Sequence, residues 1–351
     1  MKKIHYYLLL LTLGIHSLGY SANETEGFKI FAISYGDYSI PLVSNPNRPM
    51  VVQRINQTIQ MSIIENLYKE NPSSYFNPLL NRAGDRIVGV RYTVLLNTPA
   101  LLSLQIHKHL QTRDSQRIAY LNFNAATGEI IDVRELFTPQ GFSVLDFEAT
   151  QEFSISIEQF YYDMLSQMKN SELEESDKSI LEDMLFSMIY CNTQHRISKY
   201  SITPNNLFLA KTSCMPDTRS FFNDINWGYN VAIDKLDTNY LTSAGRQLLI
   251  ERKPLLDPSY TKDAKVMTIH GKINHKYAFS MILDLTSHKV LGKYWYDKNG
   301  GLIEFEGKKI HPNRIEVIEE GGKFLFEIHT DGKITGDWIK SNGQIYPIAF
   351  D

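Results

Sequence analysis

Residues 265–351 carry turn-forming residues at an even spacing, and this pattern restricts the fold more than any other feature of the chain. Each group combines Gly with Asn, Asp, Glu or Ser, and short apolar or aromatic segments separate the groups, which lie at 297–301, 306–308, 320–322, 330–333 and 341–343. Short strands joined by such turns are typical of small all-β units. We therefore predict an all-β meander here, in the form of a barrel or a sandwich.

The residues before this unit mix helical and strand patterns. Apolar residues recur every three to four positions from Val52 to Leu67, which predicts a helix. Segments rich in Val, Leu and Tyr predict strands at 86–97, 100–108 and 116–124. Tight turns join only antiparallel neighbours, so we expect an antiparallel meander.

Further along, residues 146–190 are helical in pattern, with a polar and acidic interruption at 170–178. Strands are predicted again at 197–202, 206–213 and 228–233. The whole pattern indicates an α+β protein, with antiparallel sheets packed against helices, followed by the all-β unit. The expected domains are 23–138, 139–252 and 265–351, with a Pro-containing linker at 253–264.

The first residues have the three parts of a secretory signal peptide. Lys2 and Lys3 precede a short apolar run at 8–15, and small residues follow at 17–22. The run is shorter than the roughly 20 apolar residues that span a bilayer. We expect 1–22 to be removed, which places the protein in the periplasm or outside the cell without stable membrane insertion; the alternative is an uncleaved anchor.

The two cysteines, Cys191 and Cys214, both lie in the expected mature part. Exported proteins meet an oxidising compartment, so we predict a disulfide between them. Two buried free thiols are the alternative. Two cysteines alone lack the four ligands of a structural zinc site.

Charge and motifs exclude several classes of function. The net charge is −3, from 36 basic and 39 acidic residues, so nothing favours nucleic acid as a partner. The chain lacks a Gly-x-Ser-x-Gly elbow and the glycine-rich phosphate loops. We therefore assign no catalytic, cofactor-binding or metal-binding residue.

Two pairs of residues have the spacing of chemical sites. His107 and His109 share a strand face and could supply two zinc ligands, but no third ligand is evident nearby. The alternative is a solvent-facing pair on an edge strand. Glu304 and Glu306 also share a face, and a solvated acidic strand is favoured over a glycosidase pair.

Candidate partner-binding residues are acidic or aromatic. Glu172, Glu174 and Glu175 form an acidic group that could attract a basic partner, although an ordinary solvated connection is the alternative. Trp295 and Trp338 could stack on a sugar or a protein, with core packing as the alternative.

A spread set of turn and strand residues carries a resemblance to a known family. The set includes Ile40-Pro41-Leu42, Arg54-Ile55-Asn56, Asn122-Phe123-Asn124, Thr127-Gly128-Glu129, Val133-Arg134-Glu135-Leu136-Phe137, Tyr200-Ser201-Ile202-Thr203 and Trp227-Gly228-Tyr229. Residues 28–250 thus resemble a bacterial extracytoplasmic domain pair. One of its domains accompanies peptidoglycan deacetylase modules, and the pair forms the lysozyme-sensing part of an anti-sigma factor. The segment Arg113–Arg117 departs from the Gly, Ala and His that are usual there.

Together, these observations predict an exported, non-catalytic binding protein of the cell envelope, which recognises peptidoglycan or a lysozyme-like wall hydrolase. One alternative is an envelope hydrolase with an unrecognised site, which a buried cluster of Ser, His and an acid would favour. The other is a structural protein without a specific ligand, which the absence of any concave or aromatic-lined surface would favour.

Overall fold

The structure is a computed structural model of the whole chain. It describes residues 27–68, 75–76, 87–111, 116–168, 175–194, 196–211, 228–256, 266–285, 289–298, 300–311, 313–319, 321–329 and 333–350. The predicted signal peptide, 1–22, lies outside these residues. No helix in the described part of the chain is long and apolar enough to cross a membrane.

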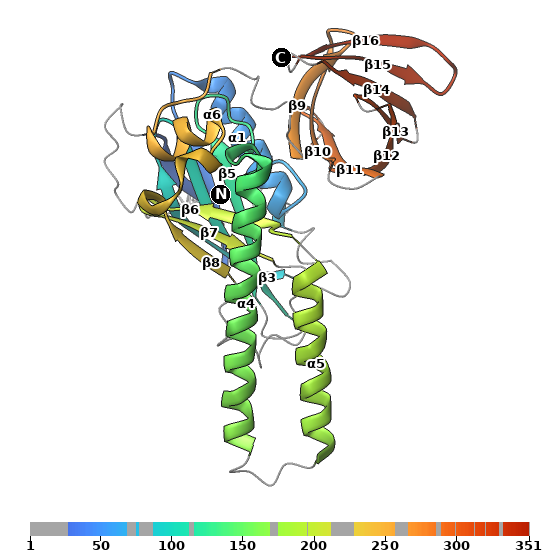
Figure 1. Cartoon of the computed structure of the whole chain (residues 1–351). Coiled ribbons are helices and arrows are strands. Elements are labelled where there is room, and N and C mark those ends of the chain that lie inside the picture. Colours follow the sequence, from blue (N-terminus) through green and yellow to red (C-terminus); the bar gives the residue numbers. More distant parts are fainter. Residues whose placement is uncertain are drawn as a thin grey trace, which may run out of the picture.

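The first part of the chain forms a five-stranded sheet in the order β1-β2-β3-β4-β5, packed against one helix (Figure 1). The elements are β1 (Lys29–Tyr35), β2 (Tyr38–Ser44), α1 (Pro49–Ile63), β3 (Ile87–Asn97), β4 (Leu101–Leu110) and β5 (Gln116–Asn124). The neighbours are antiparallel as predicted, except that β2 meets β3 in parallel through Tyr38 and Val90.

The helix α1 forms for the reason that its sequence pattern indicates. Ile55, Ile59 and Ile63 lie on one face and are fully buried against the sheet. The helix ends at Ile63, before the predicted Leu67. Glu65 adopts a positive φ of 64°, a left-handed conformation that a right-handed helix cannot continue.

The second part contains two long helices and a three-stranded sheet in the order β6-β7-β8. Its main elements are α3 (Val133–Leu136), α4 (Pro139–Met168), α5 (Glu175–Gln194), β6 (Lys199–Ile202), β7 (Asn206–Ala210) and β8 (Gly228–Ala232). Short helical turns follow: η3 (Ile233–Lys235), η4 (Thr238–Tyr240), α6 (Ser243–Gly245) and η5 (Arg246–Ile250). Leu101 of the first sheet shares a core with this part. Asn122 of β5 donates to the carbonyl of Tyr200 in β6 at 2.8 Å, so the two parts pack closely.

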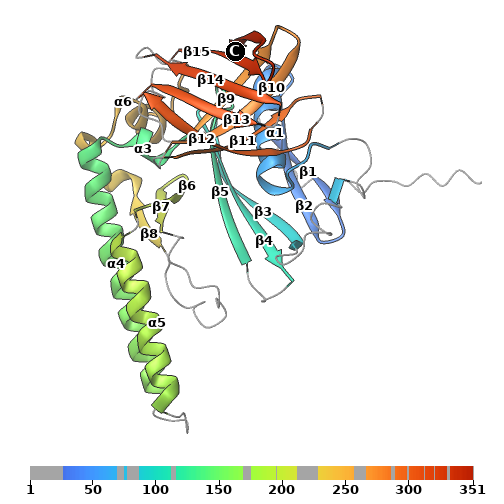
Figure 2. The ribbon, with the colours of Figure 1, turned by 90° about the vertical axis from the view of Figure 1, so that its right-hand side faces the viewer.

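The helices α4 and α5 form a hairpin that projects away from both sheets (Figures 1 and 2). A small separate core, which includes Phe153, Ile157 and Leu185, holds the two helices together. The helix α5 begins at Glu175, inside the acidic interruption predicted at 170–178, so the second helix starts earlier than expected.

The last part is a closed eight-stranded antiparallel barrel. Its strands are β9 (Val266–Ile273), β10 (Tyr277–Asp284), β11 (Lys289–Tyr296), β12 (Ile303–His311), β13 (Arg314–Glu319), β14 (Gly322–Ile328), β15 (Ile334–Lys340) and β16 (Ile345–Phe350). Consecutive strands form hairpins, and β16 returns to pair with β9. Alternate apolar side chains fill the interior, among them Phe279, Tyr294 and Phe324. The prediction of an α+β protein with a C-terminal all-β unit is thus confirmed, and the unit is a barrel.

One predicted turn is wrong. Glu306-Gly307-Lys308 lies inside β12, not between strands. A Cβ atom on Gly307 would come within 2.5 Å of the Glu316 carbonyl oxygen on β13, so this glycine permits close strand pairing. By contrast, Gly343 does occupy a turn, with a φ of 86°.

The barrel has its own core, so we expect residues 265–351 to fold as an isolated fragment. Its stability should be only a few kcal/mol, because a domain of this size buries a modest core. A ¹H–¹⁵N NMR correlation spectrum of the fragment should be well dispersed. A collapsed spectrum would show that contacts with α1 are needed to form the barrel.

Candidate functional site

The pairing of β9 with β16 leaves part of the barrel wall open. β9 pairs with β10 along its whole length, but it pairs with β16 only at Gly271–Ile273. Within the described residues, Val266–His270 therefore have no strand partner on the β16 side. We call this gap the seam.

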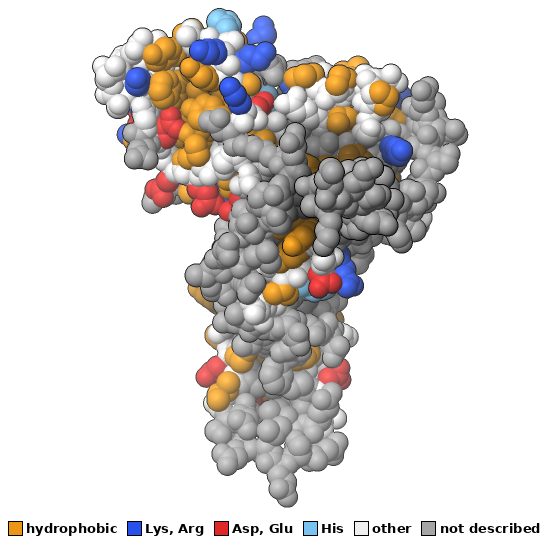
Figure 3. Space-filling view, turned by 180° about the vertical axis from the view of Figure 1, so that it is seen from behind, with side chains coloured by type: hydrophobic (Ala, Val, Ile, Leu, Met, Phe, Trp, Pro, Cys, Tyr) orange, Lys and Arg blue, Asp and Glu red, His pale blue; other side chains and the backbone are white. Residues whose placement is uncertain are grey.

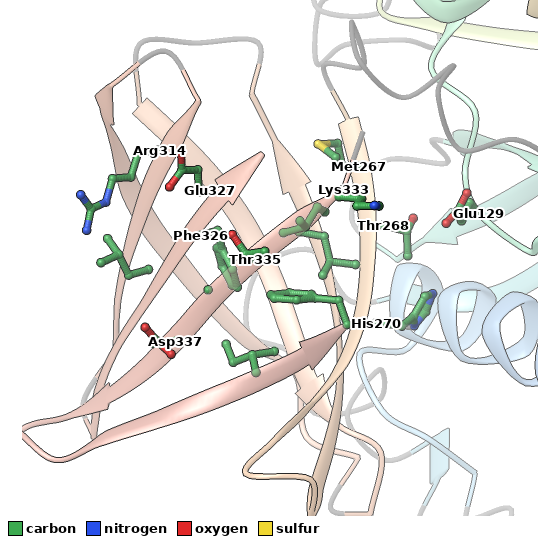
Figure 4. Close-up of a pocket in the computed structure, with 16 residues that line it drawn as sticks. Glu129, Met267, Thr268, His270, Arg314, Phe326, Glu327, Lys333, Thr335 and Asp337 are labelled. Carbon is green, nitrogen blue, oxygen red and sulfur yellow. The ribbon is translucent and has the colours of Figure 1, made fainter. Parts of the chain in front are cut away.

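A cavity of about 660 Å³ opens at the seam, with lining residues from β9, β14, β15 and β16 (Figure 4). This volume lies within the usual range for small-molecule sites, and barrels of eight strands can hold one small ligand. Much of the lining is apolar and comes from both sides of the seam: Met267, Ile269, Leu325, Phe326, Ile334, Ile348 and Phe350.

The polar lining carries both signs of charge. Arg314 and Lys333 supply cations, and Glu129, Glu327 and Asp337 supply carboxylates. Arg314 and Glu327 are register partners across β13 and β14. In Figure 4 they lie at one end of the cavity, whereas Glu129 approaches from the first sheet at the other end. The cavity can therefore contact a ligand that has both positive and negative groups.

A buried polar cluster lies where the outer face of the barrel meets α1. The Ser280 hydroxyl lies 2.9 Å from His270 Nδ1, 3.2 Å from Gln57 Oε1 and 3.2 Å from Asp297 Oδ1. The Trp295 indole N–H donates to the same Gln57 oxygen at 3.3 Å. Gln57 thus joins the helix to two barrel strands, and His270 also lines the cavity.

The hydrogen-bond partners define the state of His270. Gln57 Oε1 and the Asp297 carboxylate can only accept, so the Ser280 proton points to one of them. Nδ1 of His270 must then donate to Ser280, which leaves Nε2 as an acceptor; this tautomer is assigned from the network. Nε2 is buried and has no hydrogen-bond partner among the described residues. Burial and the nearby Arg54 guanidinium lower the pKa of His270 to about 3, so the ring is neutral at pH 7.

This cluster contains Ser, His and an acid, yet its geometry differs from that of a hydrolase triad. In a triad the imidazole lies between the nucleophile and the carboxylate. Here the carboxylate of Asp297 contacts Ser280, not His270. Ser280 is also only 1% exposed, which closes its oxygen to a substrate. The cluster therefore joins two parts of the fold and is not arranged for nucleophilic attack.

The two tryptophans proposed for partner binding lie in different surroundings. Trp295 is fully buried against α1, so it presents no face to a separate partner. Its role in the structure is to pack between the barrel and α1. Trp338 is half-buried on β15, and its indole N–H donates to the Glu319 carboxylate. Its ring lies 5.6 Å from that of Tyr346, and it does not line the cavity.

Several other predicted residues cannot be joined into a site. Glu172, Glu174 and Cys214 lie outside the described residues, so the Cys191–Cys214 disulfide stays a prediction. Glu175 is the first residue of α5, and Cys191 lies in the last turns of the same helix.

The histidine pair lies on a different kind of strand from the one expected. β4 carries His107 and His109 between β3 and β5, so it is an inner strand and not an edge. The described part of the chain contains no group of three or more His, Cys, Asp or Glu side chains that could hold a metal ion. Glu304 and Glu306 are exposed on β12, and Glu304 pairs with Lys293 at 2.8 Å.

No protein-family model matches the chain, and no curated protein matches it significantly.

Sequence reasoning missed both the cavity and the cluster of Gln57, His270 and Ser280. Strand alternation does place Thr268 and His270 on one face of β9. The sequence contains no local signal that α1 covers that face, because the two segments are more than 200 residues apart.

Proposed function

We propose that this protein is an exported, non-catalytic binding protein of the cell envelope, which recognises peptidoglycan or a lysozyme-like wall hydrolase. The cavity at the seam is the observation that carries the proposal. A concave surface that exposes parts of the half-buried Ile334 and Phe350 fits a ligand-binding protein better than a structural protein without a ligand. The arrangement of Ser280, His270 and Asp297 argues against the hydrolase alternative.

The lining favours peptidoglycan fragments as the ligand of this cavity. Such fragments join sugar rings to short peptides that carry both amines and carboxylates. Arg314 and Lys333 offer donors to ligand carboxylates, while Glu129, Glu327 and Asp337 offer acceptors to ligand amines. The apolar lining can contact sugar faces and aliphatic side chains. Hydrogen bonds to charged groups contribute about 1.5–3 kcal/mol each, so a few of them give measurable affinity.

Titration calorimetry with a soluble disaccharide-peptide fragment tests the proposal. We expect binding without cleavage, with the fragment recovered intact by mass spectrometry. Arg314→Ala should weaken binding by about tenfold or more, because one charge-assisted hydrogen bond is lost. Lys340→Ala is the matched control, since Lys340 is an exposed barrel cation that does not line the cavity.

The outcomes separate the alternatives. Equal effects of the two substitutions would move the binding site away from the cavity. Cleavage of the fragment would favour the hydrolase. Binding of a lysozyme, but not of the fragment, would identify the wall hydrolase, not peptidoglycan, as the ligand. If neither the fragment nor a lysozyme binds, the result would favour a structural protein without a specific ligand.

A further inference from the structure

The projecting hairpin of α4 and α5 is apolar on its outer faces as well as on its inner ones. On α4, Phe147 and Tyr162 are 63% and 67% exposed, and Ile155 lies between them. With 100° per residue, these three lie within 80° of one another, on the side opposite Phe153 and Ile157, which face α5. They form one outward stripe.

The shorter helix repeats the arrangement. Phe186 and Tyr190 are 73% and 61% exposed on α5, one turn apart. Leu185 and Met188, on its other side, pack against α4. Single exposed apolar residues are ordinary on protein surfaces, but stripes on both sides of a projecting element indicate an interaction surface.

The same faces carry exposed carboxylates, whereas Asp146 and Glu148 at the base of α4 contact Lys211 and Tyr229 of the fold. α4 carries five carboxylates and no Lys or Arg, and α5 carries four carboxylates and one Lys. Glu158 is exposed between Ile155 and Tyr162 in sequence, and Asp183 is exposed one turn before Phe186. Figure 3 shows hydrophobic and acidic side chains together on the hairpin, seen from behind. The chain as a whole has a net charge of only −3, so the negative charge is concentrated on the hairpin.

This charge decides between the occupants that could cover the stripes. A second copy would bring another strongly acidic hairpin, and like charges brought together cost several kcal/mol. A membrane with anionic lipids would also repel it. A positively charged protein surface gains from the carboxylates and still buries the apolar side chains.

We propose that the α4–α5 hairpin is a docking surface for a basic protein whose contact face also carries exposed apolar side chains. The hairpin projects away from the barrel, so this surface is separate from the cavity at the seam (Figures 1 and 2). A partner and a small ligand could therefore bind at the same time.

A defined probe tests this chemistry on the full mature chain. The probe is a Leu/Lys peptide of roughly 18 residues, which forms an amphipathic basic helix about as long as α5. Two control peptides are used: a Leu/Glu peptide with reversed charge and a Ser/Lys peptide without apolar residues. Binding is measured by fluorescence anisotropy near 150 mM salt, a concentration that screens weak surface attraction. We expect binding of the Leu/Lys peptide alone.

Two double variants test the surface. Phe186→Ser with Tyr190→Ser should raise the dissociation constant at least tenfold. Glu158→Lys with Asp183→Lys should also raise it at least tenfold and should reduce the salt dependence. The matched controls lie on the barrel: Ile318→Ser with Ile345→Ser, which are 58% and 61% exposed, and Glu304→Lys with Glu306→Lys. These controls should bind the probe as the parent does.

Four outcomes would overturn the proposal. In the binding assay they are failure of the Leu/Lys peptide to bind, binding of the Leu/Glu peptide as strong as that of the Leu/Lys peptide, or barrel variants that weaken binding as much as the hairpin variants do. In sedimentation it is a dimer that Phe186→Ser dissociates. The last would assign the surface to a second copy. Peptidoglycan-fragment binding, measured in the same variants, reports on the cavity alone, so failure of one proposal is distinguishable from failure of the other.

Discussion

Lowering the pH from 8 to 5 should destabilise the junction between α1 and the barrel by about 2 kcal/mol through His270 alone. The folded pKa of this residue is lowered to about 3, below the ordinary value of 6.5. The unfolded or detached state therefore takes up a proton first, and stability is lost as the pH falls below 6.5. Each pH unit in that window costs about 1.4 kcal/mol. Urea unfolding followed by tryptophan fluorescence, with Trp295 at the junction, measures the loss.

The comparison with His270→Gln isolates this effect from the other titrating groups. Asp297 and Glu129 on neighbouring elements and the Arg54 cation remain in both proteins, so their contributions cancel in the difference. The variant should be less stable at pH 8, because a fitted side chain is lost, but its stability should fall less between pH 8 and pH 5. Parallel pH profiles for the two proteins would mean that His270 is accessible to protons in the folded state.

Replacement of Glu135 by Gln should stabilise the protein at pH 7. Glu135 is the third residue of α3, and its Oε1 accepts the backbone N–H of Asp132 at 3.1 Å. Burial raises the pKa of this carboxyl to about 9, with smaller contributions from the Asp132 and Glu129 carboxylates. The group is therefore protonated when folded and ionised when unfolded. Its contribution to stability is fully present below about pH 4.5 and is lost as the pH rises towards 9.

Gln keeps the accepting oxygen and removes the titration. The pKa shift alone corresponds to roughly 3 kcal/mol at pH 7. Oε2 of Glu135 has no hydrogen-bond partner among the described residues, so the new amide N–H groups would lack acceptors and lower the gain to about 2 kcal/mol. Calorimetry at pH 4.5 and pH 8 should show a variant whose advantage grows with pH. An advantage that is absent at pH 8 would show that Glu135 is ionised in the fold.

The sequence predicted the strands, helices and turns that depend on local periodicity. The apolar residues of 100–108 and 116–124 located β4 and β5 to within two residues, and the spacing of Ile55, Ile59 and Ile63 located α1. The turn residues at 297–301 and 341–343 separated barrel strands as expected. These features depend on contacts between residues that are near in sequence, so a pattern can contain them.

The cavity and the buried cluster between α1 and the barrel depend on contacts between residues that are far apart in the sequence, so no local pattern predicts them. Trp295 alternates with inward-facing barrel residues, and only the position of α1 determines that its outward face is buried. Gly307 looked like a turn residue because flanking charges resemble those of true turns. The seam arises from the short register of β16 against β9, which is fixed by closure of the whole barrel. Apolar residues at helical spacing were visible in the hairpin's sequence, but only the projection of α4 and α5 shows which of these side chains are left uncovered.

The pairing of β16 with β9 also has a consequence for the order of folding. Gly271 and Phe350 are register partners at opposite ends of the barrel segment. Hairpins such as β9–β10 and β14–β15 can form from nearby residues, whereas this last contact must close a loop that includes every other strand. We therefore expect the pairing of β9 with β16 to form late and its amide hydrogens to exchange early. A ligand held in the cavity would contact both sides of the seam, so slower exchange at Gly271 would report its arrival.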